Sequence, residues 1–343
     1  MLAQKPTPGT PKQRLMTKRT RAAGRLYFAA ALILAAMPTA AQDLQLGFPV
    51  DCTLGESCFI QNYVDHDPGP EAHDFTCAAQ TYDTHRGTDI ALNDLAAMDA
   101  GVNIHPAAAG TVAATRDGMP DILFTDPDAP DITKRSCGNA VIIDHEDGWQ
   151  TRYCHMKRGS VTVKNGDRVT PETVIGQIGL SGKTEFPHLH ISVHKDKNVI
   201  DPFQPTASAC GAADTTLWSA PIPYVAGGLV SAGFSDVIPE FKTIKAGAAH
   251  KATLPATAAA LIVWAHIFGS QTGDVLQLTV IGEQGEFLSH TVLLKRTQAR
   301  LFRATGRKRN SVPWPTGTYT GTITLTRDNT EIDRLTTQII ITN

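Results

Sequence analysis

The sequence predicts an all-β protein, with a compact antiparallel β domain at residues 85–205 and a small immunoglobulin-like β-sandwich at residues 223–343. Two observations predict the first domain. Short apolar segments separated by glycine turns run from about residue 100 to residue 194, and an Asp-Gly pair at residues 147–148 joins two of them as a hairpin would. The sandwich is predicted by several β-rich segments, punctuated by turn formers, over roughly 120 residues.

The expected strands of the first domain follow one another at short intervals, at residues 109–115, 140–144, 149–155, 173–179 and 186–194. An acidic insertion, residues 116–136, separates the first two. Loops of that length in a compact domain are usually functional or disordered. This insertion therefore either borders a binding groove and favours a cationic ligand, or covers a site.

The sandwich is expected to use strands at residues 261–268, 275–280, 317–325 and 336–342. A linker at residues 206–222 precedes it, and a disulfide-tied lead-in at residues 42–84 precedes the first domain. Seven basic side chains lie near the end of the chain. They form either the solvated faces of two strands or a patch that attracts an anionic envelope polymer. They are Lys295, Arg296, Arg300, Arg303, Arg307, Lys308 and Arg309.

Residues 1–41 have the composition of a signal peptide. They contain seven basic and no acidic side chains, an apolar run from Leu26 to Met37, and small residues up to Ala41. We expect cleavage after Ala41, with Met16 as an alternative start, and export to the periplasm or the medium. The apolar run is too short to span a bilayer comfortably, so no stable membrane anchor is expected after cleavage.

The remaining residues carry 24 basic and 33 acidic side chains, a net charge of −9. That balance argues against a nucleic-acid partner. All six cysteines lie between residues 52 and 210, and an even number in an exported protein predicts disulfides. Cys52 and Cys58 are close enough to close a small loop, whereas the other pairings stay open. The sequence gives no indication of the oligomeric state.

The segment from residue 186 to residue 194 alternates polar and apolar residues, as a strand with one buried face does. His188 and His190 then share the other face. Such a pair is either half of a metal or acid-base site, or two exposed histidines on an ordinary strand. A second acidic and histidine-rich segment, residues 65–74, reads as a solvated loop because nothing there imposes a coordination geometry.

A second motif lies a hundred residues earlier, where His85 and Asp89 flank Gly87. In a straight strand the two side chains would be ~13 Å apart, too far to bind one ion. A bend at Gly87 would bring the imidazole and the carboxylate to a common cation. With one further imidazole, this gives two histidines and one aspartate, with a fourth position left open to water, as catalytic zinc requires.

Three motifs together resemble the successive signatures of the lysostaphin-type zinc metallopeptidases, which are bacterial cell-wall endopeptidases. They are His85-Arg86-Gly87-Thr88-Asp89, Tyr153-Cys154-His155-Met156 and His188-Leu189-His190. The resemblance covers residues 47–203 and implies a lysostaphin-like antiparallel β fold of the duplicated-hybrid-motif type. It also implies that His85, Asp89 and His190 bind one zinc ion per chain. His188 and His155 would act on the attacking water and on the oxyanion.

The resulting hypothesis is an exported zinc metalloendopeptidase that hydrolyses peptide bonds of peptidoglycan with a zinc-activated water. One alternative is a non-catalytic, cell-wall-binding activator of an amidase. Another is a metallopeptidase that acts on an envelope protein. Degenerate members of the family typically lack ligands, whereas all five positions are filled here, which favours the catalytic hypothesis. No HExxH motif occurs in the chain, so a helical zincin site is excluded.

Overall fold

The computed structural model describes residue 16 and residues 44–128, 131–206, 209–211 and 215–343. The expected signal peptide at residues 1–41, with its cleavage site after Ala41, lies outside the described residues except for Met16. Within the described ranges, no helix has the length and the apolar composition needed to cross a membrane.

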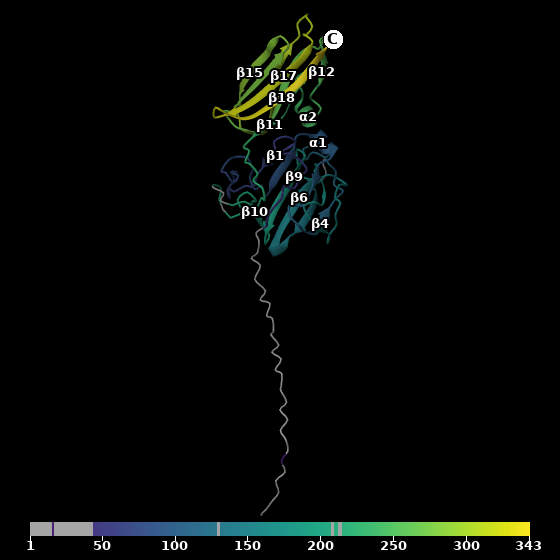
Figure 1. Ribbon diagram of the computed structural model, residues 1–343, viewed down its shortest axis with the longest axis vertical. Helices are drawn as coiled ribbons and strands as arrows, with labels where there is room; N and C mark the ends of the chain where they lie inside the picture. The colour runs from purple at the N-terminus through teal and green to yellow at the C-terminus, as the bar shows by residue number, and fades with distance from the viewer. Residues whose placement is uncertain (1–15, 17–43, 129–130, 207–208, 212–214) are drawn as a thin grey trace, which may run out of the picture. The chain divides into compact units, whose positions relative to one another are not determined.

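The first domain is built on an antiparallel sheet of eight strands (Figure 1). Seven of them follow the order β1-β2-β9-β6-β5-β4-β7, and β10 pairs with β9. The strands are β1 (Cys58–Asn62), β2 (Thr88–Leu92), β4 (Gly110–Arg116), β5 (Asn139–Asp144), β6 (Trp149–Met156), β7 (Arg168–Val169), β9 (His188–Lys195) and β10 (Asn198–Ile200). A helix, α1 (Leu95–Ala100), follows β2, and β3 (Asn103–Ile104) pairs with β8 (Gly176–Gln177) in a small second sheet.

The hairpin expected at Asp147-Gly148 is present. A short 3-10 turn, η1 (Glu146–Gly148), joins β5 to β6, and Asp147 and Gly148 adopt positive φ angles of 54° and 77°. The strand expected at residues 173–179 is shorter than predicted. Its backbone contacts two neighbouring strands, because Ile175 N donates to Ile104 O of β3 while Ile178 bridges Met156 of β6. Only Gly176 and Gln177 are therefore paired in register with β3.

The core of the first domain extends beyond the segment that carries the site motifs. Strand β1 was not expected from the sequence, yet it pairs with β2 and buries Cys58 and Ile60. At the other end, Leu217 and Trp218 are 4% exposed and pack into the same core. These two residues fall in the segment expected as a linker, so part of that segment is fixed to the first domain.

Three disulfides staple the first domain. Cys52–Cys58 closes the small loop expected from the sequence. Cys77–Cys210 joins two segments 133 residues apart, and Cys137–Cys154 ties the loop before β5 to β6. Cross-links of this kind stabilise a fold largely by constraining the unfolded chain.

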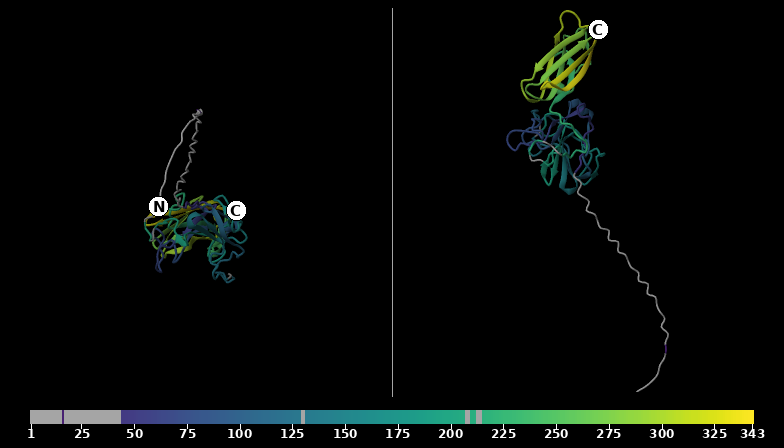
Figure 2. Two further views of the ribbon diagram at one scale, coloured as in Figure 1. Left: turned by 90° about the horizontal axis from the view of Figure 1, so that it is seen from below. Right: turned by 60° about the vertical axis from the view of Figure 1, so that its left-hand side comes forward.

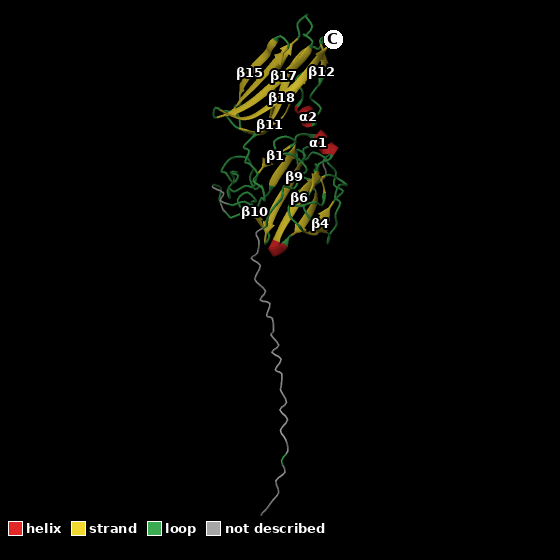
Figure 3. Ribbon diagram, in the orientation of Figure 1, coloured by secondary structure: helices red, strands yellow, loops and turns green. Residues whose placement is uncertain are grey.

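The second domain is a β-sandwich, which confirms the predicted all-β class (Figures 2 and 3). One sheet has the order β11-β13-β16 and the other β12-β18-β17-β14-β15. Apolar side chains of both sheets, such as Leu261, Leu278 and Ile323, fill the space between them. The strands are β11 (Gly228–Ser235), β12 (Thr253–Pro255), β13 (Ala260–Ser270), β14 (Val275–Gly282), β15 (Gly285–Leu293), β16 (Gln298–Lys308), β17 (Gly317–Arg327) and β18 (Thr330–Thr342), with α2 (Phe241–Lys245) after β11.

The acidic insertion is anchored to the first domain by two of its aspartates. Asp117 accepts from Gly159 N at 2.8 Å, and Asp121 accepts from Leu180 N at 2.8 Å. These carboxylates satisfy backbone donors of neighbouring loops and so hold the insertion in place. Hydrogen bonds from neutral amides leave the negative charges intact, and the acidic groove wall stays a prediction.

The seven basic residues do not share one surface. Four of them, Arg300, Arg303, Arg307 and Lys308, lie in β16, where successive side chains point to opposite faces. Lys295 and Arg296 precede this strand, and Arg309 follows it. Arg300 points to the first domain and donates Nε to Gln61 Oε1 at 2.8 Å. Arg309 instead donates to the backbone oxygens of Thr257 and Ala258. Arg300 thus contacts the first domain instead of joining a solvated basic face.

Candidate metal centre and active site

His85, Asp89 and His190 converge on one point of the first sheet. Asp89 in β2 lies opposite His190 in β9, and His85 lies just before β2. Asp89 Oδ1 is 2.8 Å from His190 Nδ1 and 3.2 Å from His85 Nε2, which is itself 3.2 Å from His190 Nδ1. The side chains of His85 and Asp89 are 1% and 3% exposed, and that of His190 is 17% exposed. The structure therefore brings together the three predicted ligands.

Gly87 makes room for this cluster. A Cβ atom at Gly87 would lie 2.6 Å from two ring atoms of His190 and 2.6 Å from Ile191 O. From the sequence, Gly87 was expected to allow a bend between His85 and Asp89. The structure adds a close approach to the imidazole of the neighbouring strand, a role that no side chain larger than hydrogen allows.

Two groups outside the predicted set orient these side chains. His85 donates Nδ1 to Tyr63 O at 2.6 Å, and Asn62 donates Nδ2 to Asp89 Oδ2 at 2.9 Å. A carbonyl can only accept a hydrogen bond, so Nδ1 of His85 carries the proton and its Nε2 presents a lone pair. That lone pair faces Asp89 Oδ1 and His190 Nδ1. Such a convergence of acceptors is favourable when a cation lies among them, and it is the donor set that divalent zinc prefers.

The surroundings of Asp89 favour the ionised form of its carboxylate. Burial alone would raise the pKa of Asp89, but the imidazoles of His85 and His188 and the hydrogen bonds from His190 and His85 hold it well below its usual range. Burial opposes charge on His85, yet Asp89 outweighs it and raises the pKa of that imidazole. Asp89 is therefore an anion at neutral pH.

His188 stands beside the cluster on β9. Its Nδ1 donates to Phe186 O at 2.9 Å, and its Nε2 is 3.5 Å from Asp89 Oδ1. The ring of Phe186 stacks on the imidazole, with centroids 4.4 Å apart. Burial lowers the pKa of His188 to about 4, so the imidazole is neutral at pH 7 and presents a basic Nε2.

His155 approaches from β6, and its backbone is in the left-handed region at φ 61°. Few residues with a side chain adopt that region, and such strain persists only where the surroundings fix it. Here His155 N donates to Cys137 O at 2.8 Å, next to the Cys137–Cys154 disulfide. The conformation places the His155 ring 4.6 Å from that of His188 and 6.0 Å from that of His190.

The imidazole of His155 is fixed in the same way as that of His188, by a hydrogen bond from Nδ1 to a backbone carbonyl. His155 donates Nδ1 to Ser181 O at 2.8 Å. Burial, together with the neighbouring His188 and His190, holds its pKa well below the usual range. Two neutral imidazoles with free Nε2 atoms therefore flank a potential metal cluster, an arrangement suited to accepting a proton from water and returning it.

The contacts of Asn62 and of the Tyr63 carbonyl with the cluster were not predicted from the sequence. Both belong to or follow β1, a strand that the sequence did not reveal, and only the pairing of β1 with β2 brings them to the cluster. A second group, Asp67, Glu71 and His73, also gathers possible ligand atoms. It lies on a partly exposed loop where His73 Nδ1 pairs with Asp67 at 3.1 Å, consistent with the solvated loop expected there.

Residues 83–202 match the family model described as Peptidase family M23. This match confirms the resemblance to the lysostaphin-type metallopeptidases. The matched segment contains all three motifs, from His85 to His190.

Curated relatives are similar over part of the chain. Over 65 residues the chain is 40% identical to an uncharacterized metalloprotease of Buchnera aphidicola subsp. Baizongia pistaciae, covering 19% of this chain and 17% of that protein. It is 32% identical over 106 residues to the peptidoglycan DD-endopeptidase ShyA of Vibrio cholerae, covering 31% of this chain and 19% of that protein. Over 109 residues it is 29% identical to the cell division protein DipM of Caulobacter vibrioides, covering 32% and 16%. The chain thus spans less than a fifth of the length of these relatives.

Solved structures are similar at lower identity. The catalytic domain of lysostaphin from Staphylococcus simulans aligns at 20% identity and a TM-score of 0.27, covering 41% of this chain and 85% of that one. The catalytic domain of the prophage-encoded M23 protein EnpA from Enterococcus faecalis aligns at 20% identity and a TM-score of 0.32, covering 45% and 96%.

Proposed function

We propose that this chain, of which residues 83–202 match the model described as Peptidase family M23, is an exported zinc metalloendopeptidase that hydrolyses peptide bonds of peptidoglycan. One observation carries the proposal: three possible ligand atoms, on His85, Asp89 and His190, lie within 3.2 Å of one another. Two buried imidazoles flank them. Metal binding and proton transfer are therefore available at the same place.

The metal in this proposal is one zinc ion per chain, held by His85 Nε2, Asp89 Oδ1 and His190 Nδ1. Two imidazoles and one carboxylate form a ligand set that suits catalytic zinc, and the orienting hydrogen bonds from Asn62 and to Tyr63 O complete it. When bound, zinc supplies Lewis-acid chemistry that makes water more acidic and polarises a carbonyl group.

His188 and His155 move the protons. Each has a fixed Nδ1–H and a basic Nε2, so each can accept the proton of the attacking water. Once protonated, an imidazolium donates from Nε2 and can stabilise the developing oxyanion or protonate the leaving amine. The close approach of the two rings places both steps within one small site.

The substrate and the location rest on broader arguments. A relative named as a peptidoglycan DD-endopeptidase suggests peptidoglycan as the partner. Export rests on the signal-like composition of residues 1–41, and the pairing of all six cysteines suits an oxidising compartment such as the periplasm. We further propose a lead-in at 42–84, a peptidase domain at 85–205, a linker at 206–222 and an accessory sandwich at 223–343. Strand β1 of the lead-in and Leu217 and Trp218 of the linker pack onto the peptidase domain.

The test is hydrolysis of purified peptidoglycan by residues 42–343. We expect free amino groups to be released. Their release should stop after chelation of the metal and resume when zinc is added. If amino groups appear only after an amidase is supplied, the chain is an activator instead. If envelope proteins are cut while peptidoglycan stays intact, the substrate assignment is wrong.

A further inference from the structure

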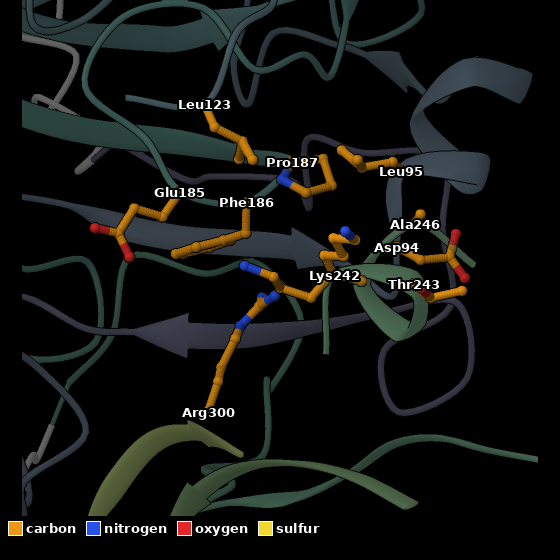
Figure 4. Close-up of a pocket in the computed structure, with 11 residues that line it drawn as sticks. Asp94, Leu95, Leu123, Glu185, Phe186, Pro187, Lys242, Thr243, Ala246 and Arg300 are labelled. Atoms are coloured by element: carbon orange, nitrogen blue, oxygen red, sulfur yellow. The ribbon is translucent and has the colours of Figure 1, made fainter. Parts of the chain in front are cut away.

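A cavity of about 390 Å³ lies where the first domain meets the sandwich (Figure 4). From the first domain it is lined by Glu185, Phe186 and Pro187, the residues directly before strand β9. From the sandwich it is lined by Arg300 of β16 and Lys242 of α2. Its size is in the range of small-ligand pockets. Because Pro187 precedes His188, the cavity adjoins the candidate active site.

Arg300 is a half-buried charge that lines this cavity. Its guanidinium carbon lies 4.0 Å from the ring centroid of Phe186, and Nε donates to Gln61 Oε1 at 2.8 Å. Nη2 is buried and has no acceptor among the described residues. Nor does any carboxylate of the described residues lie within 4.0 Å of the guanidinium nitrogens. Burial lowers the pKa of Arg300 to about 9, so the side chain is still a cation at neutral pH.

The acidic side chains of the cavity do not neutralise this cation. Asp94 and Glu185 both line the cavity. Figure 4 shows their carboxylates directed away from Arg300, at opposite sides of the view. The charge of Asp89 acts on Arg300 only from beyond 4.0 Å. A half-buried cation without a carboxylate in contact is unfavourable, and the buried Nη2 donor without an acceptor adds to that penalty. Stacking on Phe186 accounts for the position of the guanidinium, but it leaves Nη2 without an acceptor.

One aromatic ring connects Arg300 to the candidate catalytic residue. Phe186 carries the guanidinium over its ring and stacks on His188. The cavity therefore lies beside His188 and receives a residue of the sandwich. A peptide bound in this cavity would lie one aromatic ring away from His188.

We propose that the cavity is a substrate subsite in which Arg300 of the sandwich binds a carboxylate group of the peptide, a role that rests on the proposed peptidase function. A carboxylate supplies the acceptor and the negative charge that Arg300 lacks, in the geometry for which a guanidinium is best suited. The apolar lining from Phe186 and Pro187 would accommodate the adjoining part of the peptide. The sandwich thereby contributes to specificity.

The experiment uses soluble stem peptides released from peptidoglycan and the zinc-loaded chain 42–343. One pair has the C-terminal carboxylate free or amidated, and a second pair has the side-chain carboxylate free or amidated. We expect the native chain to prefer one free acid by roughly 10- to 100-fold in kcat/KM, the equivalent of one hydrogen bond to a charged group. The pair that responds identifies the carboxylate.

Arg300→Gln is expected to abolish that preference, so that acid and amide are turned over with equal kcat/KM. Arg300→Lys, which keeps the charge, should retain part of it. Arg303→Gln, on the same strand, is the matched control and should behave as the native chain. Equal losses on acid and amide in Arg300→Gln would show a purely structural role and overturn the proposal.

Calorimetric binding of the same peptides to the metal-free chain separates this proposal from the proposed function. A preference for the acid that is lost in Arg300→Gln supports the subsite even if neither peptide is hydrolysed. Equal affinity of the native chain for acid and amide overturns it even if both peptides are hydrolysed.

Discussion

The buried imidazoles of the candidate site in the first domain and the buried imidazole of the sandwich differ in their hydrogen bonds. At the candidate site, His85, His155 and His188 each donate Nδ1 to a backbone carbonyl at 2.6 to 2.9 Å. Nε2 of His85 and of His188 lies within 3.5 Å of Asp89 Oδ1. In the sandwich, His266 is completely buried, and neither ring nitrogen has a partner among the described residues. Its ring packs edge-on to that of Phe241. Burial alone therefore does not identify a functional histidine, whereas a fixed tautomer and convergence with other ligands do.

The largest difference should appear when one imidazole of each kind is removed. His188→Ala and His155→Ala should each lower hydrolysis of peptidoglycan by about 100-fold or more, the contribution of general acid-base catalysis, with zinc content unchanged. His266→Phe, the matched control, should keep full activity. Rates of amino-group release from purified peptidoglycan measure the effect. Near-native rates in both alanine variants would contradict the assigned roles.

A smaller effect is expected from the amide that orients Asp89. Asn62→Ala removes the hydrogen bond to Asp89 Oδ2 but keeps all three ligands. Losing such a partner typically weakens metal affinity or activity by ~10- to 100-fold. Competition with a zinc chelator measures the affinity, with the exposed Asn198→Ala as control. If both variants hold zinc equally well, Asn62 does not support the centre.

The smallest effect concerns the stability of the sandwich. Burial lowers the pKa of His266 from its usual 6.5 to about 3. Between these pH values the unfolded chain binds the extra proton, so stability contributed by the neutral ring is present above pH 6.5 and is lost as the pH falls. His266→Phe removes this dependence. We expect the difference in unfolding free energy between the native chain and the variant to change by up to ~1.4 kcal/mol per pH unit below pH 6.5.

Denaturant titrations at several pH values between 4 and 7 measure that difference. Other titrating histidines, such as His188, are common to both proteins and cancel. Parallel pH profiles for the native chain and His266→Phe would mean that His266 is not neutral and buried in the folded state.

The central cluster could be predicted because its ligands occur in short local motifs. His85 and Asp89 are four residues apart, and His188 and His190 share β9, so each motif is visible as a short sequence. The resemblance of the three motifs to a known family then indicated the chemistry. Asn62 could not be found in this way. It reaches Asp89 only through the pairing of β1 with β2, and that strand has no motif of its own.

Arg300 shows a second limit of the sequence. Seven basic residues within a short segment suggested a surface property shared by all of them. Pairing with β13 sets the direction of each side chain in β16, and it turns Leu301 into the sandwich core and Arg300 towards the first domain. Contacts between domains have no local sequence pattern, so neither the cavity nor the stacking on Phe186 was predictable.

The most direct test of the account is the metal content of purified residues 42–343, measured by elemental analysis with and without Asp89→Ala. We expect one zinc ion per native chain and no stoichiometric zinc in the variant. The reason is that Asp89 Oδ1 lies within 3.2 Å of both ligand imidazoles. The exposed Asp83→Ala serves as control and should keep the metal. Full zinc occupancy in Asp89→Ala, or a native chain that binds no zinc, would contradict the metal centre.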